Sequence, residues 1–424
     1  MTTQTTTRRV RSGLGTLAAA AVMLPVLAGC DSFFEVRNPG IIDAATVNPV
    51  EDGTIFSRSA FQTFASAYGT MIVYTAWFTN EGWVGDTFPT RNEYGRRAVD
   101  DRNGTHSGEV WFPLLRGIAQ GEQVIEALGS EPGTDLNVAR AALTSGFGLV
   151  LQGEAFCEGT MRGPGNTPGP LMTPAQLLET AVDRFDLAIQ RGGAASGAEA
   201  ANIVNSARVG KGRALLQLGR AGEASQAVSG VPTSFEYRVA YVDDAGNRGR
   251  LGNGVFFYSA GGARESLVVP PHYRAMNDPR ITFFDSGRDG QDSTLRLWSQ
   301  LKYPSWATGI RLASGLEARY IEIEAGQNPA AMLAFINERR AVGEQAALST
   351  TNLTELNAAL MDQRSRDFWL EGKRMGDFRR QGNLVPNILQ PGPYYKDNIG
   401  PVENQTCFPM PFSERNANPN IPES

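Results

Sequence analysis

The sequence has few of the residues on which metal sites and many active sites depend. Its 424 residues include only three cysteines and two histidines, and neither a CxxC nor an HExxH motif occurs. The common zinc arrangements are therefore excluded. No GxSxG or Walker A motif is present either, so we expect no metal, no cofactor and no catalytic residue. Scattered carboxylates leave a glycosidase open, since that chemistry needs only two well-spaced acids, but no local motif supports it.

Basic residues are also in deficit. The chain has 39 Lys and Arg against 44 Asp and Glu, a net charge of −5. Binding to a phosphate backbone needs clustered basic residues, so we expect no nucleic-acid partner. A run of about 18 apolar residues, the length that a membrane-spanning helix needs, is absent from the sequence. With 41% hydrophobic and 20% charged residues, the composition is that of a globular protein.

The first residues have the pattern of an export signal. Three arginines within residues 8–11 precede an apolar stretch, 14–27, that is too short to span a bilayer. The Ala-Gly pair before Cys30 resembles the lipobox of bacterial lipoproteins. By that resemblance, residues 1–29 are a signal peptide, cleavage leaves Cys30 as a lipidated N-terminus anchored in a membrane, and residues 30–50 form a tether. The alternative is an ordinary signal peptide with a chance cysteine.

Lipidation of Cys30 would leave an even number of cysteines. Because an exported protein enters an oxidising compartment, we expect Cys157 and Cys407 to form a disulfide. The bridge would close a loop of roughly 250 residues, for which the chain-entropy model gives about 5 kcal/mol of stabilisation. The alternative is two separate buried thiols.

Hydrophobic periodicity predicts helices through most of the chain from about residue 54. Behind a Thr-Pro start at residues 173–174, apolar residues recur at helical spacing. The other stretches of this kind are 110–128, 139–156, 201–218, 221–229, 316–325, 329–341 and 353–380. Gly212, Gly219 and Ala224 stand where tetratricopeptide repeats keep small residues for close helix packing. We therefore expect a mostly α fold built on a tetratricopeptide-like helical hairpin scaffold.

Residues 231–312 differ from the rest of the chain. They are rich in Gly, Pro and aromatic residues and contain the short β-like runs Val255–Tyr258 and Leu267–Val269. We interpret them as an irregular, loop-rich insertion within one domain that spans residues 51–424.

The strongest pattern lies in residues 353–382, where charges are dense beside a Phe-Trp-Leu run. A solvated helix face does not need so many charges next to bulky apolar residues. We therefore expect a buried ion network that joins helices, including an i,i+3 pair between Glu371 and Arg374. The expected members of the network are Arg364, Asp367, Glu371, Arg374, Asp377, Arg379 and Arg380.

This stretch resembles the SusD/RagB family of outer-membrane nutrient-binding lipoproteins. The family pattern of ER, EL, EG-x-R and DLRR-x-G is similar to Gln363-Arg364, Asp367-Phe368, Glu371-Gly372-x-Arg374 and Asp377-Phe378-Arg379-Arg380-x-Gly382. Gln363 replaces an acid, which puts one ion pair in doubt. Further matches occur in the family's order: FFEVRNPG after the lipobox, Asn277–Arg280, Ala334–Arg340, and an ending with Phe408–Pro411 and Asn418–Asn420.

The resemblance implies a SusD-like fold in which helical hairpins pack against an irregular ligand-binding region. It implies a lipid-anchored protein exposed at the surface of the outer membrane. Such a protein binds oligosaccharide or peptide nutrients, delivers them to a SusC-like TonB-dependent β-barrel transporter, and is not an enzyme. The alternative is a lipid-anchored helical-repeat scaffold that binds only protein partners.

Two aromatic clusters are candidates for the ligand site, because a sugar site needs aromatic ring faces beside a few polar side chains. One lies in residues 74–97 and the other in the irregular region. The candidate ligand-binding residues are Trp77, Asn80, Glu81, Trp83, Arg91, Tyr303 and Trp306. The competing interpretation is that these aromatic residues belong to the core or face the transporter.

Overall fold

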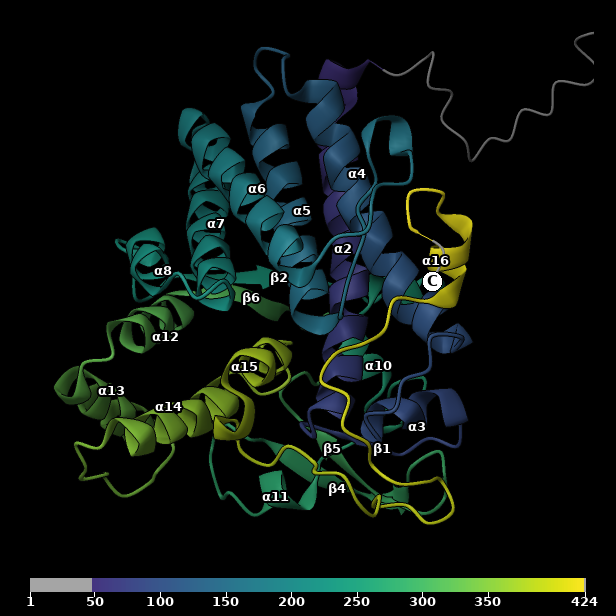
Figure 1. Ribbon diagram of the computed structural model, residues 1–424, viewed down its shortest axis with the longest axis vertical. Coiled ribbons are helices and arrows are strands. Elements are labelled where there is room, and N and C mark those ends of the chain that lie inside the picture. The colour runs from purple at the N-terminus through teal and green to yellow at the C-terminus, as the bar shows by residue number, and fades with distance from the viewer. Residues whose placement is uncertain (1–47, 423–424) are drawn as a thin grey trace, which may run out of the picture. The chain divides into compact units, whose positions relative to one another are not determined.

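The computed structural model describes residues 48–422 (Figure 1). The expected signal peptide, Cys30 and nearly all of the expected tether lie outside the described residues. Helix α2 begins at Pro49, a few residues before the start that the periodicity predicted, and the chain from Pro49 onward forms one unit. In this described part, no helix is both long enough and apolar enough to cross a membrane.

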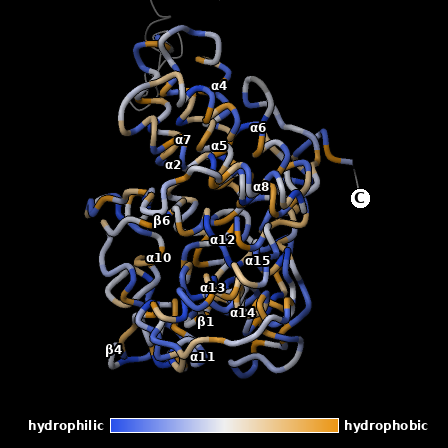
Figure 2. Tube along the Cα trace, turned by 90° about the vertical axis from the view of Figure 1, so that its left-hand side faces the viewer, coloured by the Kyte–Doolittle hydropathy of each residue, from blue (hydrophilic) through white to orange (hydrophobic). Residues whose placement is uncertain are grey.

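Six helices form a layered bundle in which each packs against the one before it in the chain. Figure 1 shows the longer ones side by side. They are α2 (Pro49–Phe78), α4 (Phe112–Leu128), α5 (Asp135–Ala155), α6 (Pro174–Ala194), α7 (Ala198–Gln217) and α8 (Ala221–Val228). Helix α5 touches α2, α4, α6 and α7, so it is buried on all sides from Val138 to its end. Along these helices hydrophobic and hydrophilic residues alternate (Figure 2).

Local sequence explains where α6 starts. The side chain of Thr173 accepts a hydrogen bond from the backbone N–H of Gln176, and the Gln176 side chain accepts one from the backbone N–H of Thr173. This capping box satisfies backbone N–H groups that the first turn leaves open. Pro174 follows at the position where a missing N–H costs nothing.

Glycines let the hairpins approach closely. The ring of Phe185 on α6 lies against Gly146 of α5 and Gly210 of α7; an added Cβ at Gly146 would stand 2.8 Å from that ring. A Cβ at Gly212 would lie 2.5 Å from Val228 on α8. The close approach predicted at Gly212 is therefore present, and the mostly α fold with tetratricopeptide-like hairpins is confirmed.

A second group of helices follows: α12 (Gly315–Gly326), α13 (Pro329–Val342), α14 (Leu353–Asp367) and α15 (Arg374–Gln381), with the short α16 (Phe412–Ala417) near the C-terminus. The expectation of one continuous helix over 353–380 is wrong. Helix α14 ends at Asp367, and Leu370 and Gly372 adopt positive φ angles of 55° and 66°. These left-handed residues turn the chain sharply between α14 and α15.

The loop-rich regions carry three small antiparallel sheets. They pair β1 (Trp83–Val84) with β3 (Leu267–Val268), β2 (Glu236–Val239) with β6 (Ile310–Ser314), and β4 (Phe283–Asp289) with β5 (Arg296–Gln300). In the first sheet, Trp83 lies opposite Val268 and Val84 opposite Leu267. Short helical pieces complete these regions: α3 (Pro89–Gly95), η3 (His106–Trp111), η4 (Pro164–Asn166), α9 (Arg248–Leu251), α10 (Gly254–Phe257), α11 (Pro271–Arg274) and η5 (Gly382–Leu384).

The predicted β-like run Val255–Tyr258 is helical instead: its first three residues lie within α10, and Tyr258 is the C-cap of that helix. Asn253 is the reason, because its side chain accepts hydrogen bonds from the backbone N–H groups of Val255 and Phe256 and so caps the helix. This local cap outweighs the preference of these apolar residues for a β-strand.

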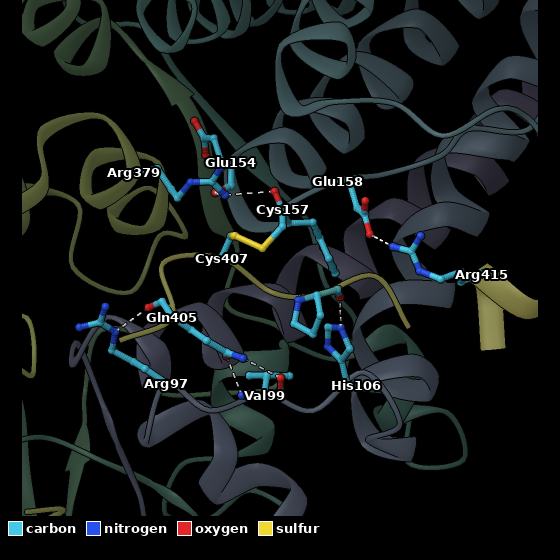
Figure 3. Close-up of a disulfide and its surroundings, with 12 residues drawn as sticks. Arg97, Val99, His106, Glu154, Cys157, Glu158, Arg379, Gln405, Cys407 and Arg415 are labelled. Carbon is cyan, nitrogen blue, oxygen red and sulfur yellow. Dashed lines mark hydrogen bonds and ion pairs between the residues drawn. A yellow bond between two sulfur atoms is a disulfide. The ribbon is translucent and has the colours of Figure 1, made fainter. Parts of the chain in front are cut away.

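A disulfide joins Cys157, just after α5, to Cys407 in the C-terminal segment (Figure 3). The predicted pairing is therefore present, with the two Cα atoms 5.1 Å apart. The backbones also bond beside it, since the N–H of Cys157 donates to the carbonyl of Phe408 at 2.9 Å. Nearby, the Arg379 guanidinium donates to the carbonyl of Phe156, and His106 bonds the carbonyl of Pro409 (Figure 3). The C-terminal segment is thus fastened to the helical bundle.

The charged residues of the C-terminal stretch form the predicted buried network. Arg364 pairs with Asp377, Arg380 with Glu324, and Asp367 with both Arg280 and Arg339. The expected pair between Glu371 and Arg374 is absent. Glu371 instead binds Lys302 and Arg311 at 2.7 Å each, whereas Arg374 donates to the carbonyls of Thr79 and Pro386. The helix break at Gly372 separates the two side chains, and Gln363 keeps one link of the network by accepting from Arg280 at 2.9 Å.

Candidate functional site

The loop between α2 and α3 is the structural centre of the candidate site. It carries Asn80 at a positive φ of 60°, so the chain turns directly after α2. The Asn80 side chain then accepts a hydrogen bond from the indole of Trp83 at 2.8 Å and donates one to the carbonyl of Asn387 at 2.7 Å. These bonds hold Trp83 in β1 against the C-terminal segment.

Trp83 stacks on Tyr395, with ring centroids 4.1 Å apart and an interplanar angle of 6°. The Tyr395 hydroxyl accepts hydrogen bonds from the backbone N–H of Val84 at 2.7 Å and from the hydroxyl of Tyr394 at 2.8 Å. The ring of Tyr394 also packs on Tyr395, with centroids 4.0 Å apart and an interplanar angle of 39°. Tyr395 is therefore held between two aromatic rings and by hydrogen bonds at its tip, and its ring is half-buried.

Tyr395 lines a hollow of about 450 Å³, which we call the Tyr395 hollow. Short polar and charged side chains share its wall, as a site for a hydroxyl-rich ligand requires. The lining residues besides Tyr395 are Asp86, Thr87, Asp292, Thr294, Leu295, Lys396, Asp397, Asn398 and Ile399.

A buried ion pair organises the polar side of the Tyr395 hollow. The Lys396 ammonium contacts the Asp292 carboxylate at 2.8 Å and donates to the carbonyl of Asp86 at 2.7 Å. Burial by itself raises the pKa of Asp292, but hydrogen bonds from Lys396 and from backbone N–H groups outweigh it and hold that pKa below its ordinary value. Asp292 is therefore a fixed anion, and the exposed Thr87, Asp397 and Asn398 remain to meet a ligand.

A second hollow, about 240 Å³, opens on the other side of the Asp86–Arg91 segment; we call it the Arg264 hollow. Arg91 lies in its wall with only 4% of its side chain exposed, paired with Asp86 at 2.7 Å and Glu109 at 3.1 Å. Because Asp86 lines one hollow and Arg91 the other, their ion pair forms the partition between them. Trp306 is buried behind the wall of the Arg264 hollow, where its ring packs against Phe257 and lies 5.6 Å from the Arg248 guanidinium.

Six of the seven predicted ligand residues are buried, all except Trp83, and Trp77, Glu81 and Tyr303 lie deepest in the protein. Trp77 and Tyr303 have no exposed surface, and Glu81 is 1% exposed. Trp77 packs edge-on against Tyr74 and Tyr258, and the Tyr303 hydroxyl donates to the carbonyl of Leu370 at 3.0 Å. In this structure these side chains are core residues and do not face a ligand, which agrees with the competing interpretation.

Glu81 has an unusual environment for a carboxylate. Its Oε1 accepts from the backbone N–H of Leu370 at 2.9 Å, whereas its Oε2 has no hydrogen-bond partner within the described residues. Burial raises its pKa to about 7, although Arg374 and Lys302 act in the opposite direction.

The remaining predicted residues gather around the two hollows. Asn80 and Trp83 support Tyr395 from behind, and Arg91 forms the partition. The buried Trp306 packs behind Phe257, which lines the Arg264 hollow. Tyr395, the ring that lines the larger hollow, was missed. A usable signal exists in the sequence, since Tyr394-Tyr395-Lys396-Asp397-Asn398 combines aromatic and short polar residues within a Gly- and Pro-rich segment.

Among residues 48–422, no three His, Cys, Asp or Glu side chains cluster in a way that would hold a metal ion. Both histidines are packed in the interior, and burial lowers the pKa of each to about 4. They are therefore neutral at physiological pH and hold structural positions.

Comparison with known proteins identifies the fold. No protein-family model matches the chain, and no curated protein matches its sequence. Solved structures do match. A laminarin-binding SusD-like protein has 14% identity and a TM-score of 0.67, with 88% of this chain and 98% of that one covered. A SusD-like carbohydrate-binding protein from Bacteroides vulgatus has 13% identity and a TM-score of 0.65, with 88% and 97% covered.

A third similar structure is surface glycan-binding protein A from Bacteroides uniformis. It has 14% identity and a TM-score of 0.60, and the alignment covers 86% of this chain and 98% of that one. At these identities the likeness concerns the backbone. It extends over nearly the whole length of each matched structure, loop-rich regions included. The chain described here has the SusD-like fold.

Proposed function

We propose that this protein is a surface-exposed, outer-membrane lipoprotein of the SusD/RagB family that binds oligosaccharides and delivers them to a TonB-dependent β-barrel transporter. The observation that carries the proposal is the Tyr395 hollow, a fixed aromatic ring beside exposed hydroxyl, amide and carboxylate groups within a SusD-like fold. The half-buried ring offers its exposed apolar part to a sugar, and Thr87 and Asn398 offer hydrogen bonds to the sugar hydroxyls. The protein acts as a binding protein and catalyses no reaction.

Sequence motifs support the membrane and transporter parts of the proposal. The lipobox-like end of the apolar stretch makes Cys30 the lipid anchor. The Glu371-Gly372-x-Arg374 and Asp377–Gly382 motifs are those of the nutrient-binding family. Ligand released from the Tyr395 hollow would enter a barrel beneath the protein.

Two measurements test the proposal. The first is thermal stability against a panel of neutral and acidic oligosaccharides and peptides. A ligand that binds only the native state raises stability by RT ln(1 + [L]/Kd), so at least one glycan should raise the Tm, and Tyr395→Ala should abolish that rise. The second is a mild-detergent pull-down of the natively anchored protein, which should recover a large β-barrel protein in stoichiometric amount.

The alternatives give different results. A lipid-anchored scaffold predicts protein partners but no Tm shift with any glycan or peptide. Binding of peptides alone would keep the transport role and change the ligand class. Turnover of a chromogenic glycoside by the purified protein would overturn the assignment as a binding protein.

A further inference from the structure

A second polar groove lies on the helical bundle, along α4. Its hollow of about 290 Å³ is bounded by α4 on one side and by the loop that contains η4 on the other. We call it the α4 groove. Its lining residues are Phe112, Leu115, Arg116, Ala119, Gln120, Gln123, Arg162 and Asn166.

The side chains of α4 form a row along this groove. Phe112, Arg116, Gln120 and Gln123 are separated by four, four and three positions, so they project from one face of the helix. At the helical rise per residue the row is roughly 16 Å long. The row therefore offers an aromatic ring followed by three long polar side chains, an arrangement suited to an extended ligand with repeating polar groups.

The polar side chains of this row have no bonding partner among the described residues. Within residues 48–422, the side chains of Arg116, Gln120 and Gln123 form no hydrogen bond or ion pair, and the Oε1 atom of Gln120 is buried without a partner. A buried polar atom without a partner costs free energy. Gln120 is therefore suited to accept a hydrogen bond from a ligand, and the exposed Arg116 and Gln123 are positioned to donate to the same ligand.

The charge of the groove is opposite to that of the protein. The chain carries a net charge of −5, yet two guanidinium groups and no carboxylate line the α4 groove. Arg162 also contacts Glu414 at 3.4 Å, so of the two guanidinium groups in the groove only Arg116 is without an ion pair. A carboxylate or sulfate would pair with it, because guanidinium recognises planar anions through paired hydrogen bonds.

We propose that the α4 groove is a second saccharide-binding site, selective for a linear acidic glycan that carries carboxylate or sulfate groups. The anionic group binds Arg116 and Arg162, a sugar ring packs on Phe112, and hydroxyl groups bond to Gln120, Gln123 and Asn166. The buried oxygen of Gln120 favours a glycan over a simple anion such as sulfate, because a sugar hydroxyl donates a hydrogen bond to that oxygen and a sulfate ion has no proton to donate.

The test compares two ligands that differ only in charge, an oligogalacturonide and the same oligomer with its carboxylates methyl-esterified. Isothermal titration at low and high salt should show binding of the acidic oligomer that weakens as salt is added. Arg116→Gln should lower that affinity about tenfold, and Gln120→Ala should lower it about fivefold. Arg58→Gln is the matched control, since Arg58 is a 65% exposed helix arginine that contacts only Glu199; it should change nothing.

The outcomes separate this site from the Tyr395 hollow. If acidic binding is lost in Tyr395→Ala and kept in Arg116→Gln, the acidic glycan occupies the Tyr395 hollow and the α4 groove proposal is overturned. Equal binding of both oligomers by wild type also overturns it. If wild type ignores the oligomers but binds phosphatidylglycerol vesicles in an Arg116-dependent way, the groove contacts a membrane surface and the proposal fails. Loss of neutral glycan binding in Tyr395→Ala, measured separately, concerns only the proposed function.

Discussion

Trp83 stacks on Tyr395 across 4.1 Å with nearly parallel rings, and only Tyr395 lines the hollow. The two rings therefore have different tasks. Trp83 fixes the position of Tyr395, which is the ring that a sugar would contact. The indole N–H of Trp83 donates to Asn80, so Trp83 has no free hydrogen-bond donor for a ligand.

Replacing these rings one at a time tests the contact and its support. Tyr395→Ala should weaken glycan binding about tenfold, because an aromatic contact contributes about 1 kcal/mol beyond its buried area. It should also lower stability by about 1–3 kcal/mol, since it removes the stack and the acceptor of the Val84 N–H. Trp83→Ala should weaken binding and also lower stability by about 1–3 kcal/mol, since it removes the stack and the bond to Asn80. Titration calorimetry and thermal melts of both variants check this. Undiminished binding by Tyr395→Ala would remove the hollow from consideration.

The buried carboxylate of Glu371 should be essential to stability near neutral pH. It neutralises Lys302 and Arg311, so Glu371→Gln leaves Lys302 without a counter-charge and Arg311 with only the more distant Glu236, and should cost about 3–5 kcal/mol. Chemical denaturation measures the loss. Glu236→Gln is the control, because Glu236 lies 3.8 Å from the same Arg311 but is 38% exposed; it should cost less than about 1 kcal/mol.

Glu371 also predicts a loss of stability in acid. Burial alone raises its pKa, but Lys302 and Arg311 outweigh burial and lower the pKa to about 2. The folded protein therefore holds Glu371 ionised where the unfolded chain protonates it. Its contribution, about 3 kcal/mol, is complete above pH 4.5, the ordinary value, and is lost as the pH falls from there toward 2. Denaturation of wild type between pH 5 and pH 3 should show this fall, and Glu371→Gln should show a shallower one.

Parts of the site were predictable because the composition of one short stretch of the sequence indicates a binding site there. The stretch of residues 74–97 contains Asn80, Trp83 and Arg91, which all surround the hollows. The same composition includes Trp77, which is buried by Tyr258 from a distant part of the chain. Periodicity and residue type do not distinguish the two tryptophans, because burial is decided by which distant segment covers each ring.

The partners of the predicted residues were not predictable for the same reason. Tyr395 lies 311 positions from Val84, to which it is hydrogen-bonded. The charged stretch predicted that Glu371 would be paired, but Lys302 and Arg311 come from the loop-rich region. The helical scaffold was easier to predict, since hydrophobic spacing and caps such as Thr173 act over a few residues.

The disulfide should contribute substantially to stability. Cys157→Ser with Cys407→Ser removes a link between residues 250 positions apart and should lower the free energy of unfolding by about 2–5 kcal/mol. The variant should still fold, because Phe408 remains hydrogen-bonded to the backbone of Ala155 and Cys157. Guanidinium denaturation measures the difference. Wild type reduced before unfolding should match the double variant, and equal stability of oxidised and reduced protein would contradict the prediction.

Glu81 should destabilise the protein as the pH rises through neutrality. Its folded pKa, raised by burial to about 7, exceeds the ordinary value of 4.5. The folded state therefore holds a proton that the unfolded chain has released, and the stability that this proton provides is complete below pH 4.5 and is lost as the pH rises toward 7. The loss amounts to about 3 kcal/mol. Glu81→Gln keeps an oxygen to accept from Leu370 and removes the titrating group. In denaturation experiments the variant should gain on wild type between pH 5 and about pH 7 and level off above that, whereas Glu403→Gln, at a 52% exposed side chain, should follow wild type. A constant difference between Glu81→Gln and wild type across that range would show that the buried carboxylate does not titrate there.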